Sequence, residues 1–377
     1  MLAMLALAAA TQEPVLAADS EARWVPFELT ASNQIRFTIQ AGGRDVSAIL
    51  DTGISISVVS RGFADTLGLK HLESGRATAI GGAIPIDLAA APRVAFGGLS
   101  RTGGRVAVAD MAGIPGVSAE IYVGADLLGC CAIDIDYPAR RFRILPSGRM
   151  PFTGDTAPLS KVRGSGVFVT EFTLGTRRLR PILVDTGDGS SLTLTSQAWT
   201  TARPPGTRVT TTLGYGAGGA LVSDAAILPG IMLGGRATGE TELRIEAAGG
   251  FSQMAGTAGR IGTGLLMRYR VLLDPGAGRM VLRPDPAAER TPLRSTSGLL
   301  VNYANGALRI LHVMRGSPAE QAGFAAGERI CAADGQPVRE DVEADGKVDW
   351  TVGTPGRVVR LRECDGRERT ITLRAFY

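Results

Sequence analysis

The sequence predicts a mostly β protein with two similar lobes and a small C-terminal α+β domain. Three observations support this prediction. Short runs of β-branched and aromatic residues alternate with Gly, Pro and Asp up to about Asp285. Within that stretch, a set of motifs occurs twice in the same order. A third unit, with a different pattern of strands and a short helix, begins near Thr291.

Composition narrows the class of protein. A chain of 377 residues with 45% hydrophobic content can bury a sizeable core in two or three domains. The formal net charge of +4 raises the question of nucleic-acid binding. The basic residues are scattered, however, and aromatic residues make up only 5% of the chain. We therefore expect no nucleic-acid partner, because the sequence offers neither a basic block nor a stacking platform.

Residues 1–18 are expected to be a signal peptide. Residues 1–10 form an apolar run too short to span a bilayer, and small residues at 15–18 offer a cleavage site. The usual basic n-region is missing, so a misplaced start codon or a small-residue N-terminal helix remains as an alternative. No later apolar run reaches membrane length. We expect an exported protein, periplasmic or secreted, without a stable membrane span.

The four cysteines constrain the fold only weakly. Cys130 and Cys131 are adjacent, and a bridge between neighbours is strained, so we expect both to be small buried residues. Cys331 and Cys364 lie in the third unit and could pair in an oxidising compartment. The sequence leaves that disulfide open.

Local patterns place the first elements along the chain. One short helix is predicted at residues 61–69, where Gly68 would end it. Runs of β-forming residues between turn signals predict strands at 35–39, 57–59, 106–108 and 142–145.

The internal repeat organises the first 287 residues. Each copy begins with an apolar strand that ends in Asp-Thr-Gly, at Asp51 and at Asp185. Each continues with an apolar-Gly-x-x-Leu-Leu unit, at Gly124 and at Gly262, and then with a strand, a turn and a final strand that starts at Arg. The repeat predicts lobes at residues 20–148 and 160–287, joined by a linker rich in Pro, Gly, Ser and Thr around residues 146–160.

At these residues the chain resembles the retropepsin-like aspartic proteases. The resemblance covers both lobes and implies two retropepsin-like β-barrel lobes that form a pepsin-like bilobal aspartic protease in one chain. It further implies that Asp51 and Asp185 are the catalytic dyad of an aspartic-type endopeptidase. Residues that match the family's active-site support are Thr52 and Thr186, whose hydroxyls would interlock between lobes, and the turn residues Gly53 and Gly187.

The chemistry of two paired carboxylates fits peptide hydrolysis without reference to a family. The reaction needs a base to activate water and an acid to protonate the carbonyl oxygen or the leaving nitrogen. Two carboxyls held close together keep one proton between them and so supply both roles. The two histidines, His71 and His312, lie in unrelated regions, and no nucleophile elbow or clustered metal ligands occur. We expect neither a metal site nor a cofactor.

Two residues depart from the family pattern directly after the triplets, where Ala or Ser is usual. Ile54 follows Gly53, and Asp188 follows Gly187. An extra carboxylate near the dyad would raise the cost of ionising it and could move the activity optimum. We therefore expect Asp188 to alter the behaviour of this dyad.

The resemblance also implies a flap hairpin over the site in each lobe. Gly81 and Gly82 mark the flap of the first lobe; Gly214, Tyr215 and Gly216 mark that of the second. The second stretch also spells Gly-x-Gly-x-x-Gly, but no βαβ pattern surrounds it, which argues against a dinucleotide site. A glycine-rich tip suits a mobile lid over an extended substrate. Tyr215 either lines the site or only caps the loop.

The third unit, residues 291–377, resembles bacterial PDZ domains. A strand, then Gly-Ser-Pro-Ala-x-x-Ala-Gly, then Gly-Glu-Arg-Ile occur in order, with Ser317 suited to cap a short helix and Pro318 to begin it. The resemblance implies that residues 297–300 receive a peptide carboxylate while the peptide adds as a strand. The binding residues would then be Gly298, Leu299 and Leu300. Alternatively, the domain only packs against the lobes.

The sequence is therefore interpreted as an exported aspartic endopeptidase of bacterial type whose PDZ domain recruits or positions a peptide or protein substrate. A non-catalytic peptide-binding or scaffolding protein with the same fold is the alternative. Because both triplets lie in one chain, we expect a monomer, with a homodimer as the other arrangement.

Overall fold

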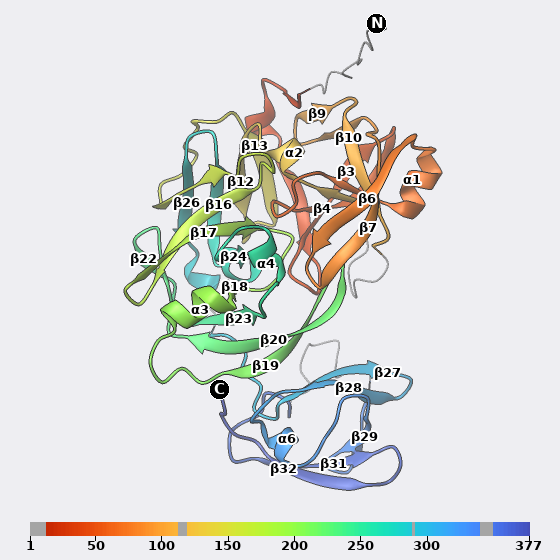
Figure 1. Ribbon diagram of the computed structural model, residues 1–377, viewed down its shortest axis with the longest axis vertical. Coiled ribbons are helices and arrows are strands. Elements are labelled where there is room, and N and C mark those ends of the chain that lie inside the picture. Colours follow the sequence, from red (N-terminus) through yellow and green to blue (C-terminus); the bar gives the residue numbers. More distant parts are fainter. Residues whose placement is uncertain (1–12, 112–118, 289–290, 340–349) are drawn as a thin grey trace, which may run out of the picture.

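The computed structural model describes residues 13–111, 119–288, 291–339 and 350–377, and it is mostly β (Figure 1). Residues 1–12 of the expected signal peptide lie outside the described residues. The following residues include a short strand, β1 (Val15–Leu16), which pairs with β9 (Leu99–Arg101). No helix within the described ranges is both long and apolar enough to cross a membrane.

The first lobe carries the first copy of the repeat. The expected helix at residues 61–69 is present as α1 (Arg61–Leu67), where Ser60 accepts a hydrogen bond from the backbone N–H of Phe63 and Gly68 ends the helix at φ +58°. The other elements of this lobe are η1 (Ser20–Ala22), β2 (Val25–Leu29), β3 (Ile35–Ala41), β4 (Arg44–Leu50), β5 (Val58–Ser60), β6 (His71–Ala79), β7 (Gly82–Ala90), β8 (Val94–Phe96), β10 (Arg105–Ala109), β11 (Ile121–Val123), α2 (Ala125–Leu128), β12 (Ala132–Asp136) and β13 (Arg141–Leu145).

The second lobe repeats this order. Its elements are β14 (Asp155–Pro158), β15 (Ser160–Lys161), β16 (Phe168–Leu174), β17 (Arg177–Asp185), β18 (Leu192–Thr195), α3 (Ser196–Ala202), β19 (Thr210–Gly216), β20 (Gly219–Leu228), β21 (Met232–Leu233), β22 (Arg236–Ala237), β23 (Thr241–Glu246), α4 (Phe251–Met254), β24 (Gly259–Gly262), α5 (Thr263–Leu266), β25 (Tyr269–Asp274), β26 (Arg279–Pro284) and η2 (Pro286–Ala288).

Strand pairing shows that the two lobes are built alike. The order β4-β11-β5-β10-β7-β6 in the first lobe corresponds to β17-β24-β18-β23-β20-β19 in the second. In both, the strand that precedes the Asp-Thr-Gly triplet runs parallel to the strand that precedes the Gly-x-x-Leu-Leu helix. Each triplet therefore lies at the same point of the same sheet topology.

The lobes are joined by more than a linker. β12 pairs antiparallel with β25, and β14 pairs with β26, so strands of both lobes form one 16-stranded sheet. β14 lies inside the expected linker at residues 146–160, which is thus partly a strand of the shared sheet. A single buried cluster extends through both lobes and includes Phe142 and Phe168. This shared core holds the two triplets in a fixed relation.

The C-terminal domain has its own sheet and its own core. Its elements are β27 (Leu299–Ala304), β28 (Ala307–Val313), α6 (Pro318–Gln321), β29 (Arg329–Ala333), β30 (Gln336–Pro337), β31 (Val358–Glu363) and β32 (Glu368–Thr372). The side chain of Ser317 accepts a hydrogen bond from the backbone N–H of Glu320, and Pro318 begins the helix, as expected. The core includes Ile310 and Trp350.

The cysteines differ in part from expectation. The structure joins Cys130 to Cys131 in a disulfide, and Cys130 is exposed, so the expectation of two small, buried, unbridged residues is wrong. The pair follows α2 at a turn where the chain reverses into β12, which brings the two side chains together. Cys331 and Cys364, left open above, also form a disulfide, between β29 and the end of β31.

Candidate active site

The two triplets meet at the centre of the bilobal structure. Asp51 follows β4 and accepts a hydrogen bond from the backbone N–H of Gly53 at 3.0 Å. Asp185 ends β17 and accepts one from the N–H of Gly187 at 3.1 Å. A Cβ atom added to Gly53 would lie 2.4 Å from Cγ of Asp185, and one added to Gly187 would lie 2.3 Å from Cγ of Asp51. Each carboxyl therefore packs against the opposite triplet, where only glycine leaves room for it.

The threonines of the triplets interlock across the lobe interface. Thr52 Oγ1 donates to the carbonyl of Val184 at 2.6 Å and accepts from the N–H of Thr186 at 3.1 Å. Thr186 Oγ1 donates to the carbonyl of Leu50 at 2.7 Å and accepts from the N–H of Thr52 at 3.1 Å. Both side chains are fully buried. The four hydrogen bonds fix the separation and angle of the two strand ends that carry the carboxyls.

The surroundings favour a dyad that retains a proton. Burial, and after it the charge of Asp188, raise the pKa of Asp51 from 3.8 to about 6 against hydrogen bonds that lower it. Burial raises the pKa of Asp185 well above its ordinary value, and the charges of Asp51 and Asp188 add to this effect. Both carboxyls thus resist ionisation, and the pair titrates as a unit.

Asp188 belongs to a buried ion-pair network behind the second triplet. Its carboxylate accepts from the backbone N–H of Ser190 at 2.9 Å and from Nε of Arg260. Arg260 also donates to Glu246 and, at 3.0 Å, to Ser252. Burial opposes ionisation of Asp188, but the charges of Arg260 and Arg244 outweigh it, so the pKa of Asp188 is lowered. Asp188 therefore stays charged beside the dyad and raises the pKa of both Asp51 and Asp185, as expected for an extra carboxylate at this position, while a moved activity optimum stays a prediction.

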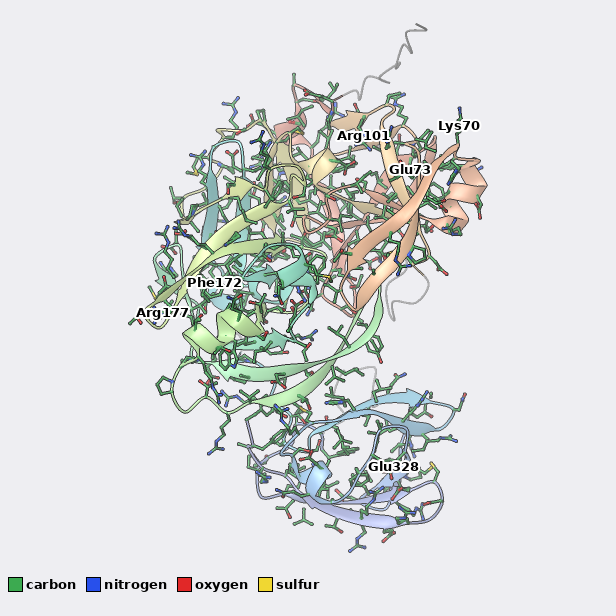
Figure 2. The ribbon with its side chains drawn as sticks, viewed as in Figure 1. Lys70, Glu73, Arg101, Phe172, Arg177 and Glu328 are labelled. Atoms are coloured by element: carbon green, nitrogen blue, oxygen red, sulfur yellow. A yellow bond between two sulfur atoms is a disulfide. The ribbon has the colours of Figure 1, made fainter. Side chains whose placement is uncertain are left out.

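The first lobe uses a different ion pair to stabilise the loop that follows its Asp-Thr-Gly triplet. Asp126 accepts hydrogen bonds from the backbone N–H and the hydroxyl of Ser57 at 2.8 and 2.7 Å. Nη1 of Arg101, labelled in Figure 2, donates to the same carboxyl at 2.6 Å. In the second lobe Gly264 takes the position of Asp126. A Cβ added to Gly264 would lie 2.9 Å from the carbonyl oxygen of Gly189, which leaves little room for a side chain. The two loops are therefore supported by different chemistry.

The tips of the two glycine-rich hairpins touch each other. Gly81 and Gly82 lie at the turn between β6 and β7, and the backbone N–H of Gly218, at the turn between β19 and β20, donates to the carbonyl of Ile80 at 2.9 Å. A Cβ added to Gly216 would lie 2.2 Å from that carbonyl oxygen. The tips thus pack backbone against backbone, which explains their glycines.

Tyr215 and Gly214 are the other two residues expected in the flap of the second lobe. Tyr215 is 41% exposed, which favours a capping role over one in lining the site. Gly214 lies over Arg244, whose Nη1 would be 3.0 Å from an added Cβ.

Comparison with family models agrees with this geometry. Residues 35–127 match the model described as aspartyl protease, and residues 309–349 match that of a PDZ domain. An aspartyl protease domain and a C-terminal PDZ domain are present in this chain. The matched stretch of the protease model holds Asp51, and the shared strand order relates the second lobe to it. A comparison with curated proteins found no match.

The expected peptide-binding loop of the PDZ domain is closed on itself. Gly298 has φ +81°, and a Cβ added there would lie 2.0 Å from Cβ of Ser317. The N–H of Gly298 donates to the hydroxyl of Ser295 at 2.9 Å, and that of Leu299 donates to the hydroxyl of Ser297 at 3.1 Å. These two N–H groups are therefore already engaged inside the domain. A peptide-binding role for Gly298, Leu299 and Leu300 stays a prediction.

Several residues of the protease site were not assigned from the sequence. Gln34 Nε2 donates to the carbonyl of Gly187 at 2.8 Å across the lobe interface, and nothing in the local pattern indicates this contact. Tyr122 and Arg260 lie two residues before the glycine of each Gly-x-x-Leu-Leu unit, close to the dyad. Aligning the two copies of the repeat position by position would have singled out both.

Proposed function

We propose that this protein is an aspartic endopeptidase that hydrolyses peptide bonds with a water activated by Asp51 and Asp185. The observation that carries the proposal is the close packing of each carboxyl against the opposite triplet, with the threonine interlock beneath. The dyad offers one base and one acid. The ionised carboxyl takes a proton from the attacking water, while the protonated carboxyl donates to the carbonyl oxygen of the substrate.

The surroundings favour one shared proton on the dyad. Burial and the charge of Asp188 raise the pKa of both Asp51 and Asp185, and the charge of Asp51 adds to this effect at Asp185. When one carboxyl has ionised and the other keeps the proton, the ionised member serves as the base and the protonated member as the acid. The flaps must part to admit a peptide, because their tips are in contact, and they close over it to exclude water.

We further propose that the PDZ domain positions a protein substrate. The flap of the second lobe lies alongside β28 of the C-terminal domain (Figure 1). The backbone of Arg315 exchanges hydrogen bonds with Thr210 and Thr211, and its guanidinium donates to Asp224 at 2.9 Å. A further hydrogen bond of 2.8 Å joins Thr211 to His312. A peptide held on the PDZ domain would thus lie next to the flap hairpin β19–β20.

The location and assembly of the protein are also proposals. The disulfide between Cys331 and Cys364 supports export to an oxidising compartment, either periplasmic or extracellular. Since one chain supplies both aspartates, a monomer contains the complete dyad. We expect light scattering to report the mass of one chain.

The experiment is incubation of denatured protein substrate with the wild type from pH 4 to pH 8, beside Asp51→Asn and Asp185→Asn. We expect cleavage by the wild type and loss of cleavage in both variants, because each removes one member of the dyad. Asp45→Asn, at an exposed carboxylate on β4, is the matched control and should cleave normally. Equal cleavage by the wild type and both dyad variants would refute the mechanism. Absence of cleavage by all of them, with peptide binding retained, would favour the scaffolding alternative.

A further inference from the structure

Each lobe presents one row of side chains on the sheet face that carries its catalytic aspartate. Side chains two positions apart on a strand share a face, so Ile49 lies on the face of Asp51 and Leu183 on that of Asp185. Paired neighbours extend both rows across the sheet. The first-lobe row is Ala107, Val58, Tyr122 and Ile49, and the second-lobe row, at the same register positions, is Arg244, Thr193, Arg260 and Leu183. Most residues on either side of these positions, such as Leu50, Val123 and Ile261, belong to the main core.

The row of the first lobe is apolar. Ile49 and Tyr122 are buried in a cluster apart from the main core, with Ile54, Val58 and Met111 partly buried against them. Tyr122 adds one polar atom, a buried hydroxyl that has no hydrogen-bond partner within the described part of the chain. Burial, and then the charge of Asp51, raise the pKa of Tyr122, so this side chain lies near the dyad as a neutral group. The wall beside Asp51 therefore suits an apolar side chain.

The row of the second lobe is charged instead. Arg260 is 3% exposed, and its donors are taken up by Asp188, Glu246 and Ser252. It is thus an internal part of the wall.

Arg244 belongs to the same row, and its side chain is partly exposed. The exposed fraction of this side chain is 30%, and its buried Nε has no hydrogen-bond partner among the residues that the structure describes. Glu242 Oε1 lies 3.6 Å from its Nε, beyond hydrogen-bond distance. Nη1 lies beneath the flap at Gly214. An arginine carries five donors and no acceptor, and buried donors without partners are costly. This guanidinium therefore lies near Asp188 and beneath the flap, with an unused donor at Nε.

We propose that Arg244 makes the second-lobe half of the cleft a binding site for a substrate side chain that accepts hydrogen bonds, while the first-lobe half binds an apolar side chain. The acceptor is the oxygen of a carboxylate or of an amide, so the substrate class is a peptide with Glu, Asp, Gln or Asn on one side of the scissile bond and an apolar residue on the other. This inference rests on the proposed function. A lysine side chain is disfavoured because its ammonium carries only donors and offers no acceptor to Arg244.

Carboxylate and amide substrates can be told apart by the charge around Arg244. Asp188 and Glu242 lie near the guanidinium, as the lowered pKa of Asp188 and the 3.6 Å contact indicate. Both carboxylates repel a substrate carboxylate but not an amide. If the negative neighbours dominate, kcat/KM for a peptide with Gln should therefore equal or exceed that for a peptide with Glu. If the guanidinium dominates, kcat/KM for the Gln peptide should be the lower of the two.

The test is cleavage of peptides that carry Glu, Gln, Leu or Lys at each position flanking a fixed bond. With the wild type we expect kcat/KM for Glu or Gln to exceed that for Leu by about tenfold on one side of the bond only, since hydrogen bonds to a charged group are worth that much or more. Arg244→Met should abolish that preference while leaving the apolar preference on the other side. Arg244→Lys, which keeps the charge, should retain part of it. Arg208→Met, at an exposed arginine of the same lobe, is the matched control.

A second readout separates this inference from the proposed function. Binding of non-hydrolysable reduced-amide peptides with Glu, Gln or Leu is measured by calorimetry on the wild type and on Arg244→Met, after circular dichroism has shown that both are folded. Tighter binding of the Glu or Gln peptide, lost in Arg244→Met, would support the pocket even if no peptide were cleaved. Equal affinity for all three peptides, an unchanged preference in the variant, or no binding of any peptide would overturn it. Should Arg244→Met fail to fold, Arg244→Lys decides the outcome by a reduced or an unreduced preference.

Discussion

Replacing Asp51 by Asn should stabilise the protein at neutral pH and not at acid pH. Burial raises the pKa of this carboxyl from 3.8 to about 6, so the folded state opposes its ionisation. Below the unfolded value of 3.8 the carboxyl is protonated in both states, and the folded state carries no penalty. As the pH rises through about 6 the penalty grows to its full size. A shift of about two units corresponds to about 3 kcal/mol, at 1.36 kcal/mol for each unit.

The assay is thermal unfolding of the wild type and Asp51→Asn at pH 3.5 and at pH 7.5. We expect the variant to melt several degrees higher at pH 7.5, and both proteins to melt within about a degree of each other at pH 3.5. Asp45→Asn, on the same strand but exposed, should change the melting temperature little at either pH. The reasoning fails if Asp51→Asn is equally stabilising at both pH values, or destabilising at pH 7.5.

Three further predictions concern the same site. The pH profile of kcat/KM should be bell-shaped. It should rise as the pH increases through about 6, because one carboxyl of the dyad ionises, and fall at higher pH, because the second carboxyl loses its proton. A profile that is flat between pH 5 and 8 would contradict this prediction. Thr52→Val should lower the free energy of unfolding by about 3 kcal/mol in urea titrations, because it leaves the Val184 carbonyl and the Thr186 N–H unpaired, whereas Thr52→Ser should lose much less. Arg260→Met should cost about 3–5 kcal/mol at pH 7 by leaving two buried carboxylates unpaired, and calorimetry that finds a loss no larger than that of Arg208→Met would exclude a stabilising role.

Local motifs were enough to predict the centre of the site. An apolar strand that ends in Asp-Thr-Gly places a carboxyl at a strand end, and its second copy identified the partner, so Asp51 and Asp185 could be paired before the structure was known. The flap glycines were expected from the resemblance to the protease family, and the structure places Gly81 and Gly216 where the two hairpin tips meet. At Gly81, an added Cβ would lie 2.6 Å from the carbonyl oxygen of Gly219, in the opposite flap.

Features that depend on register between distant strands could not be predicted in this way. The neighbours of Arg260 in space are Asp188 and Glu246, and only the pairing of β18 with β23 and β24 brings all three together. β14 looked like a linker because its Pro and Asp disfavour strands, yet pairing with β26 overrides that local preference. The contact of Arg315 with the second flap joins two domains and has no local signal.

The shared sheet has a consequence for how this cleft could have diverged. When two identical chains form such a site, every substitution appears on both sides at once, and the two halves of the cleft must remain the same. Here the pairing of β12 with β25 closes the site within one chain, so each half mutates independently. That freedom is visible at a single pair of equivalent positions, where Tyr122 stands beside one aspartate and Arg260 beside the other. Because both lobes belong to one chain, the two halves of the cleft can differ, and such a cleft can bind a peptide in one orientation only.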